Sequence, residues 1–171
     1  MTPSSRFGRC VVLSATLRGI EAVPVHVEVS IGPGLPGFSI VGMADAAIQE
    51  SRERVKAAIR ACGFTMPADK IVVNLAPSSL KKTGSGFDLP IALGLLVASG
   101  QVNPAIVRDS LVVGELSLEG ATRPVSGILA YQLGARELGC NLICPEQDEG
   151  LYPLSDLLVF VADSLRDFAG E

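Results

Sequence analysis

The sequence predicts a single α/β domain of the α+β type, in which helices cover a mixed sheet. Three observations lead to this fold class. Valines alternate with other residues at 23–29, which is the pattern of a strand with one buried face. An apolar stripe at helical spacing runs through 45–62, and a second helical segment at 89–99 is apolar on nearly every side. Because strands come first and then alternate with helices, the 171 residues fit one domain with a sizeable core.

Strands are predicted where β-branched or alternating residues run between glycine and proline. The first two strands form an antiparallel hairpin that turns at Gly19. Pro77 ends the fourth strand, and a turn at Glu119-Gly120 ends the fifth. In chain order the strands are expected at 11–17, 23–29, 38–42, 71–75, 111–118, 140–144 and 157–161.

Helices are predicted from apolar spacing and from capping residues. Asp45 is a good N-cap for the first helix, and Gly63 suits the left-handed conformation that ends it. Asp88 is expected to cap the second helix, which should be the most buried of all. The helices are expected at 45–62, 89–99, 127–138 and 163–169.

The composition excludes disordered and membrane-spanning proteins. Hydrophobic residues make up 48% and charged residues 19% of the chain, so the low hydrophobicity typical of disorder is missing. The longest apolar run, Leu89–Ala98, is about ten residues long, and a membrane span needs roughly 18. No apolar core follows Arg6 and Arg9, so no secretory signal is expected. We therefore expect a cytoplasmic domain without membrane contact.

The net charge of −4 is unevenly distributed along the chain. Residues 1–85 contain ten basic and six acidic residues, whereas residues 86–171 contain four basic and twelve acidic ones. The halves therefore have net charges of +4 and −8. They form either two surfaces of opposite sign or charges scattered over the folded domain.

Cysteine and histidine give no metal-site pattern. Cys140 and Cys144 are spaced C-x3-C within a predicted strand, and the only histidine is His26 in another strand. A structural zinc site requires four ligands. We expect reduced thiols and no metal site.

A glycine-rich segment at 84–86 precedes the second helix, as in anion sites at helix N-termini. No G-x4-G-K-[ST] run exists, so no cofactor is expected in this chain. Lys81 and Lys82, next to this segment, are either anion ligands or, as we expect, solvated loop lysines. Ser85 with Lys82 is the plausible Ser–Lys pair, although nothing nearby in sequence predicts a lowered lysine pKa.

The basic residues of the first helix either contact nucleic-acid phosphates or, as we expect, form a solvated or subunit-facing surface. Glu50 lies four residues before Arg54, a spacing that favours an intrahelical ion pair. The candidate residues for DNA or partner contact on the helix and the glycine-rich segment are Arg52, Arg54, Lys56, Lys81 and Lys82.

Three blocks of the sequence resemble a known family. The first is Gly34 to Val55, with G-L-P-G-F-S-I-V-G-M-A-D-A-A; the second joins 74–77 to G-F-D-L-P-I-A at 86–92; the third joins 113–120 to 123–125. Together they resemble the N-terminal domain of the ComM/YifB, magnesium-chelatase-related AAA+ ATPases of bacteria. The second and third blocks are also similar to the Lon protease domain and its relative in RadA.

The resemblance covers about residues 7–165. It implies a ribosomal-protein-S5-domain-2-like, Lon-protease-like fold. Lon-type proteases have a nucleophilic serine at the start of the apolar helix and a lysine after the Gly-Glu turn. The matching positions here are Asp88 and Leu129. Because neither residue replaces its counterpart chemically, the resemblance implies a domain without catalytic activity.

The resemblance also implies a longer protein with a downstream AAA+ domain that binds ATP and Mg. Such a protein is a hexameric motor that acts on DNA, and ComM is linked to branch migration during transformation. The expected partners are the chain's own AAA+ domain, further copies of the chain, and DNA. Two alternatives remain: an active Lon-like peptidase that uses Ser85 and Lys82, and an oligomerisation scaffold without DNA contact.

Overall fold

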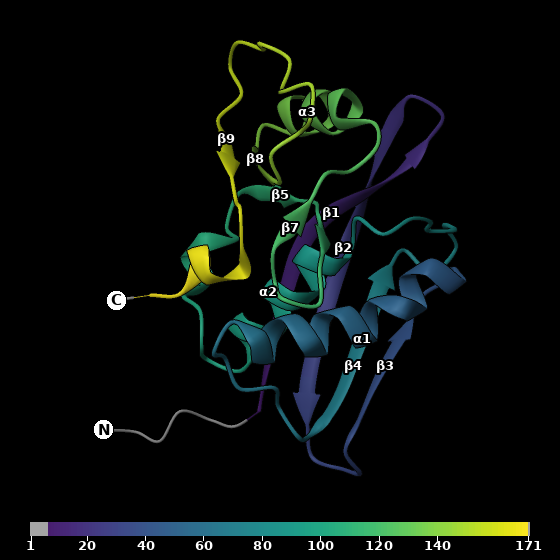
Figure 1. Ribbon diagram of the computed structural model, residues 1–171. Helices are drawn as coiled ribbons and strands as arrows, with labels where there is room; N and C mark the ends of the chain where they lie inside the picture. The colour runs from purple at the N-terminus through teal and green to yellow at the C-terminus, as the bar shows by residue number, and fades with distance from the viewer. Residues whose placement is uncertain (1–6, 171) are drawn as a thin grey trace.

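The computed structural model describes residues 7–170. The strands are β1 (Gly8–Arg18), β2 (Glu21–Gly32), β3 (Gly37–Val41), β4 (Lys70–Ala76), β5 (Ser110–Val112), β6 (Glu115–Leu116), β7 (Thr122–Arg123), β8 (Asn141–Cys144) and β9 (Val159–Val161). The helices are α1 (Ala46–Ala61), α2 (Asp88–Ala98) and α3 (Ile128–Glu137), with 3-10 turns at Pro104–Ile106 and Leu165–Phe168. Seven strands form one mixed sheet in the order β3-β4-β2-β1-β5-β8-β9, and β6 pairs with β7 beside it (Figure 1). The α+β prediction is confirmed.

The long hairpin of β1 and β2 lies at the centre of the sheet. It turns at Gly19, whose φ of +61° lies in the left-handed region, and pairs Leu13 with His26. The predicted hairpin is therefore confirmed. β4 joins β2 antiparallel, whereas β3, β5, β8 and β9 each pair in parallel with a neighbour.

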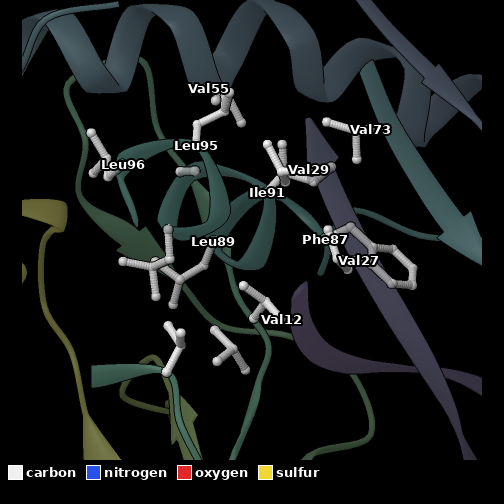
Figure 2. Packing of buried hydrophobic residues seen from close by; sticks show 14 of the residues in the cluster. Val12, Val27, Val29, Val55, Val73, Phe87, Leu89, Ile91, Leu95 and Leu96 are labelled. Atoms are coloured by element: carbon white, nitrogen blue, oxygen red, sulfur yellow. The ribbon is translucent and has the colours of Figure 1, made fainter. Parts of the chain in front are cut away.

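α1 and α2 cover one face of the sheet. Figure 2 shows Val27 and Val29 of β2 beside α2, with Val55 of α1 on the far side of α2. α2 is apolar all round because it is enclosed between the sheet and α1. At Gly94 a Cβ would lie 2.6 Å from a methyl group of Val29, so only glycine permits this close approach of α2 to β2.

α3 packs on the opposite face of the sheet, where it contacts β2 and β8. Successive side chains of a strand point to opposite faces, so Val12 joins the α2 core while Leu13, Ala15 and Leu17 join the second core beneath α3. This second core also contains side chains of β5 and β8.

The termini of α1 agree with the sequence. Asp45 is the N-cap, and its Oδ1 accepts a hydrogen bond of 2.9 Å from the backbone N–H of Ile48. Gly63 follows the helix with a φ of +82°. Both capping predictions are confirmed.

The prediction of one continuous strand at 111–118 is wrong, because the structure has two strands there, β5 and β6. Between them the N–H of Gly114 donates to Gly86 O at 2.9 Å, and Gly114 O accepts from Leu89 N at 2.9 Å. These bonds attach the connection to the start of α2. The predicted helix at 163–169 is a 3-10 turn that begins at Leu165.

The two halves of the chain build opposite halves of the sheet. β1 to β4 come from residues 8–76, whereas β5, β8 and β9 come from residues 110–161. The basic and acidic halves of the sequence therefore lie at opposite ends of the sheet order. Within residues 7–170, no helix is both long and apolar enough to cross a bilayer.

Candidate functional site

The first residue of α2, Asp88, lies at the centre of a buried polar cluster. Its carboxylate is fully buried and accepts hydrogen bonds from Ser51 Oγ at 2.5 Å and from Arg54 Nε at 2.6 Å. Arg54 Nη2 donates a further bond of 3.1 Å, and the backbone N–H of Leu116 donates one of 3.0 Å. Asp88 thus joins α2 to α1 and to β6. We call Asp88, Arg54, Ser51 and Leu116 the Asp88 cluster.

The expectation that Asp88 caps α2 is wrong. Phe87 occupies the N-cap position, where it makes no capping hydrogen bond through its side chain. Asp88 is already helical, and the donors to its carboxylate are 28 to 37 residues away in sequence and belong to α1 and β6. An acidic residue in the first helical turn remains favourable for the helix dipole.

Arg54 has two carboxylate partners. The predicted pair with Glu50 is present, with Arg54 Nη1 at 3.5 Å from Glu50 Oε2. The stronger contact is to Asp88, whose hydrogen bond raises the pKa of Arg54 against the opposing effect of burial. The Arg54 side chain is 18% exposed. Its charge is therefore balanced inside the protein, which leaves it poorly placed for the surface contact that the sequence suggested.

Lys82 is a second buried cation. Its side chain is fully buried, and Nζ donates to Gly42 O at 2.6 Å and to Pro77 O. Its backbone N–H also donates to Met43 O, and its carbonyl accepts from Asp45 N. Burial lowers the pKa of Lys82. The expectation of a solvated loop lysine is wrong for Lys82, which instead ties residues 42–45 to residues 77–82.

The Ser–Lys alternative has no direct contact in this arrangement. Among residues 7–170, the hydrogen bonds of Lys82 Nζ go to two backbone carbonyls and not to Ser85. Ser85 instead lines a cleft of about 310 Å³ together with Glu115, Ser126 and Tyr131. Burial raises the pKa of Tyr131 to about 12, so its phenol stays protonated at neutral pH.

Leu129 is the residue that the resemblance matches to the protease lysine. It lies half-buried in the first turn of α3 and lines a separate cleft of about 580 Å³ with residues 147–153. An alkyl side chain offers neither a base nor a nucleophile to this cleft.

Three of the predicted basic residues remain near the surface. Arg52 Nε donates to Gln49 O at 3.1 Å within α1, and Lys56 lies 3.7 Å from Glu53. Lys81 is exposed next to the buried Lys82. The structure therefore divides the five candidates into two engaged inside the protein and three accessible from solvent.

Comparison with known proteins gives the family. Residues 27–148 match the model of the family described as subunit ChlI of Mg-chelatase. The chain belongs to this family. YifB of Salmonella typhimurium (strain LT2) is 40% identical over 149 residues, which are 86% of this chain and 29% of that protein. Competence protein ComM of Haemophilus influenzae is 37% identical over 158 residues, 92% of this chain and 31% of that protein.

A more distant relative supports the likeness to proteases. Lon protease 1 of Sorangium cellulosum is 27% identical over 151 residues, which are 83% of this chain and 18% of that protein. The chain thus spans less than a third of the length of each of these three relatives.

The ChlI-family name mentions magnesium, but the described residues do not form a metal cluster. No group of three or more His, Cys, Asp or Glu side chains in residues 7–170 is arranged to hold a metal ion. The four cysteines are free thiols. Burial raises the pKa of Cys144 to about 12, so this thiol is a poor metal ligand at neutral pH.

Proposed function

We propose that this ChlI-family chain is a non-catalytic assembly and substrate-engaging domain of a ComM-like, ATP-driven motor that processes DNA. The observation on which the proposal rests is the Asp88 cluster. At the position that the resemblance matches to the nucleophile of Lon-type proteases, this chain has a buried carboxylate with four hydrogen bonds from its own fold. A carboxylate so engaged supports packing of α1 on α2 and is not free to attack a substrate.

The motor activity itself belongs to the rest of the longer protein in this proposal. The chain spans 31% of ComM, whose name refers to competence. We expect an AAA+ domain in the same protein to bind ATP and Mg, and a ring of copies, by analogy a hexamer, to form the working assembly. DNA and further copies of the chain are the proposed partners.

DNA contact in this proposal is made to phosphates. Aromatic residues are only 5% of the chain, which leaves little capacity for stacking on bases. Of the five candidate residues, Arg52, Lys56 and Lys81 have accessible side chains, whereas Arg54 and Lys82 are engaged inside the fold. Phosphate contacts of this kind give affinity that falls with added salt.

Fluorescence anisotropy with single-stranded and forked DNA tests the DNA contact. We expect salt-sensitive binding that weakens in a double variant, Arg52→Glu with Lys81→Glu, and a salt slope that falls by roughly one for each phosphate that the variant no longer neutralises. Arg18→Glu is a single-site control, since Arg18 is an exposed basic residue at the end of β1. The β1–β2 turn that follows it lies away from α1 (Figure 1). Equal binding by the double variant and the control would favour a scaffold without DNA contact at this surface.

The absence of catalysis is tested separately with casein. We expect no cleavage by the wild-type chain. Cleavage that Ser85→Ala abolishes would overturn the non-catalytic part of the proposal and establish the peptidase alternative.

A further inference from the structure

One edge of the sheet exposes apolar side chains that have no cover within the described chain. At the β3 edge, Leu35 is 88% exposed and Met43 is 54% exposed, with Val41 between them in sequence. Met43 has a φ of +59°, which is uncommon for a residue with a side chain, and Lys82 holds this segment through Gly42 O. We call Leu35, Val41 and Met43 the β3-edge patch. A buried lysine thus holds the Met43 end of this patch through hydrogen bonds to Gly42 O and Met43 O.

The other edge of the sheet exposes a second set of apolar side chains. At β9, Leu158 is 71% exposed and Phe160 is 53% exposed, and Val161 follows. We call these three residues the β9-edge patch. β3 and β9 are the first and last strands in the sheet order, so the two patches lie at opposite ends of the sheet.

The charges near the β3-edge patch are mostly basic. Lys70 packs against the segment before β3, because a Cβ added to Gly34 would lie 3.1 Å from Lys70 Cδ. Lys81 directly precedes Lys82, whose backbone N–H bonds to Met43 O. Arg52 extends from α1 toward Gln49, which itself contacts β3. The carboxylate of Asp45 is nearby, but it accepts hydrogen bonds from the backbone of Ile48 and Gly84.

The charges near the β9-edge patch are mostly acidic. Asp156 precedes the strand and Asp163 follows it, and both are exposed. Asp167 and Arg108 line an apolar cleft of about 340 Å³ that includes Leu158 and Phe160. Arg166 is also exposed, but it donates to Ala61 O at 2.7 Å. Both edges therefore expose apolar side chains, but the charges around the β3 edge are mostly basic and those around the β9 edge are mostly acidic.

We infer that the β3-edge patch of one copy of this chain docks on the β9-edge patch of a second copy. The occupant is a second copy because both complementary surfaces belong to one chain: apolar side chains meet apolar side chains, and Lys70 and Lys81 meet Asp156 and Asp163. In this inference side chains make the contact, and the bond of 3.0 Å from Gln49 Nε2 to Ile40 O of β3 leaves one backbone acceptor fewer for an added strand.

This contact is heterologous, meaning that the two copies use different surfaces. Each added copy leaves one β3 edge and one β9 edge free, so the association continues until it closes into a ring or extends as an open array. The inference rests on the proposed role of this chain as an assembly domain and assigns the surfaces through which copies meet.

Sedimentation of single and mixed variants tests this geometry. Met43→Asp blocks only the β3-edge patch, and Leu158→Asp blocks only the β9-edge patch. We expect the mass of the wild-type chain to rise with concentration above the 17.8 kDa monomer and to fall with added salt. Each variant alone should stay monomeric, whereas an equimolar mixture should give a dimer, because one intact contact joins the two variants.

Ile20→Asp is the matched control. Ile20 is 94% exposed at the tip of the β1–β2 hairpin, away from both edges, so this variant should associate as the wild type does. Aspartate is compatible with the left-handed backbone conformation of Met43, so Met43→Asp should fold. Circular dichroism of each variant verifies folding.

Three results would overturn the inference: a wild-type chain that stays monomeric at every concentration, a mixture that stays monomeric, or one single-edge variant that still dimerises with itself. The last result would indicate a symmetric contact. DNA anisotropy on the Met43→Asp variant separates this outcome from the proposed function, because DNA binding by a monomer would leave the substrate-engaging role intact.

Discussion

The charges of Arg54 in the Asp88 cluster and of Lys82 are compensated in two different ways. Both cations lie inside the fold near the start of α2. Arg54 meets the carboxylate of Asp88, and its pKa is raised. Lys82 meets only the carbonyl oxygens of Gly42 and Pro77, and its pKa is lowered. Neutral dipoles thus compensate burial less well than an opposite charge does.

The difference matters because the two regions hold different parts of the chain. The Asp88 cluster fixes α1 on α2 and on β6, within the body of the domain. Lys82 fixes the exposed segment around Met43, which belongs to the β3-edge patch. A stability defect is therefore expected from the first region, and a defect in presenting a surface from the second.

Of the three substitutions considered for stability, removal of the Arg54 cation should lower the free energy of unfolding most. Arg54→Met leaves Asp88 buried without its charged partner, and we expect a loss of about 3–5 kcal/mol in the free energy of unfolding. Urea unfolding at neutral pH measures it. Arg52→Met on the same helix is the control and should change stability by about 0.5 kcal/mol or less. Equal losses for both variants would contradict the assigned role of Arg54.

Removing the hydroxyl of the Asp88 cluster should have an intermediate effect. Ser51→Ala deletes the 2.5 Å hydrogen bond to Asp88 Oδ1 but leaves the bonds from Arg54 and Leu116. Because the acceptor is charged, we expect a loss of about 1.5–3 kcal/mol, measured by the same urea unfolding. In a cycle with Arg54→Met the two losses should not add, since both residues share Asp88. Strict additivity would separate Ser51 from the cluster.

Removing the cation at Lys82 should have the smallest effect at neutral pH. Lys82→Met removes the bond from Nζ to Gly42 O and the bond to Pro77 O, although Pro77 O still accepts from the Leu80 N–H. We expect a loss of about 1–2 kcal/mol, because a desolvated charge is removed together with these bonds. Lys81→Met is the exposed neighbour and serves as control.

The Lys82 variant also has a defined pH dependence. Since the folded-state pKa of Lys82 is lowered from 10.5, the folded protein releases this proton at a lower pH than the unfolded chain does. The contribution of Lys82 to stability therefore increases as the pH rises from the folded pKa toward 10.5. The difference between wild type and Lys82→Met should widen over that range, and a constant difference would contradict the lowered pKa.

Local patterns predicted most of the fold correctly. The hairpin at Gly19, the Asp45 cap and the end of α1 at Gly63 all depend on residues within a few positions of one another. The division of the strand at 111–118 was missed because Gly114 bonds to Gly86 and Leu89, more than twenty residues earlier in the chain. A pattern confined to one segment contains no information about such a partner.

The site was only partly predictable for the same reason. The sequence singled out Asp88, but it predicted a helix cap there because Asp88 precedes an apolar helix. It also placed Lys82 among solvated lysines because its neighbours in sequence are polar. Lys81 and Lys82 are adjacent and chemically identical, yet one is exposed and the other fully buried. Only the position of the backbone relative to Gly42 and Pro77 distinguishes them.

The sequence alone determined the family and most of the element order, because these depend on residue type and spacing. It also determined the +4 and −8 division of charge. The tertiary structure decided that this division lies along the sheet, with β3 at one end and β9 at the other. It also decided which basic residues keep their charge available, because burial and hydrogen bonding act through contacts between segments far apart in the chain.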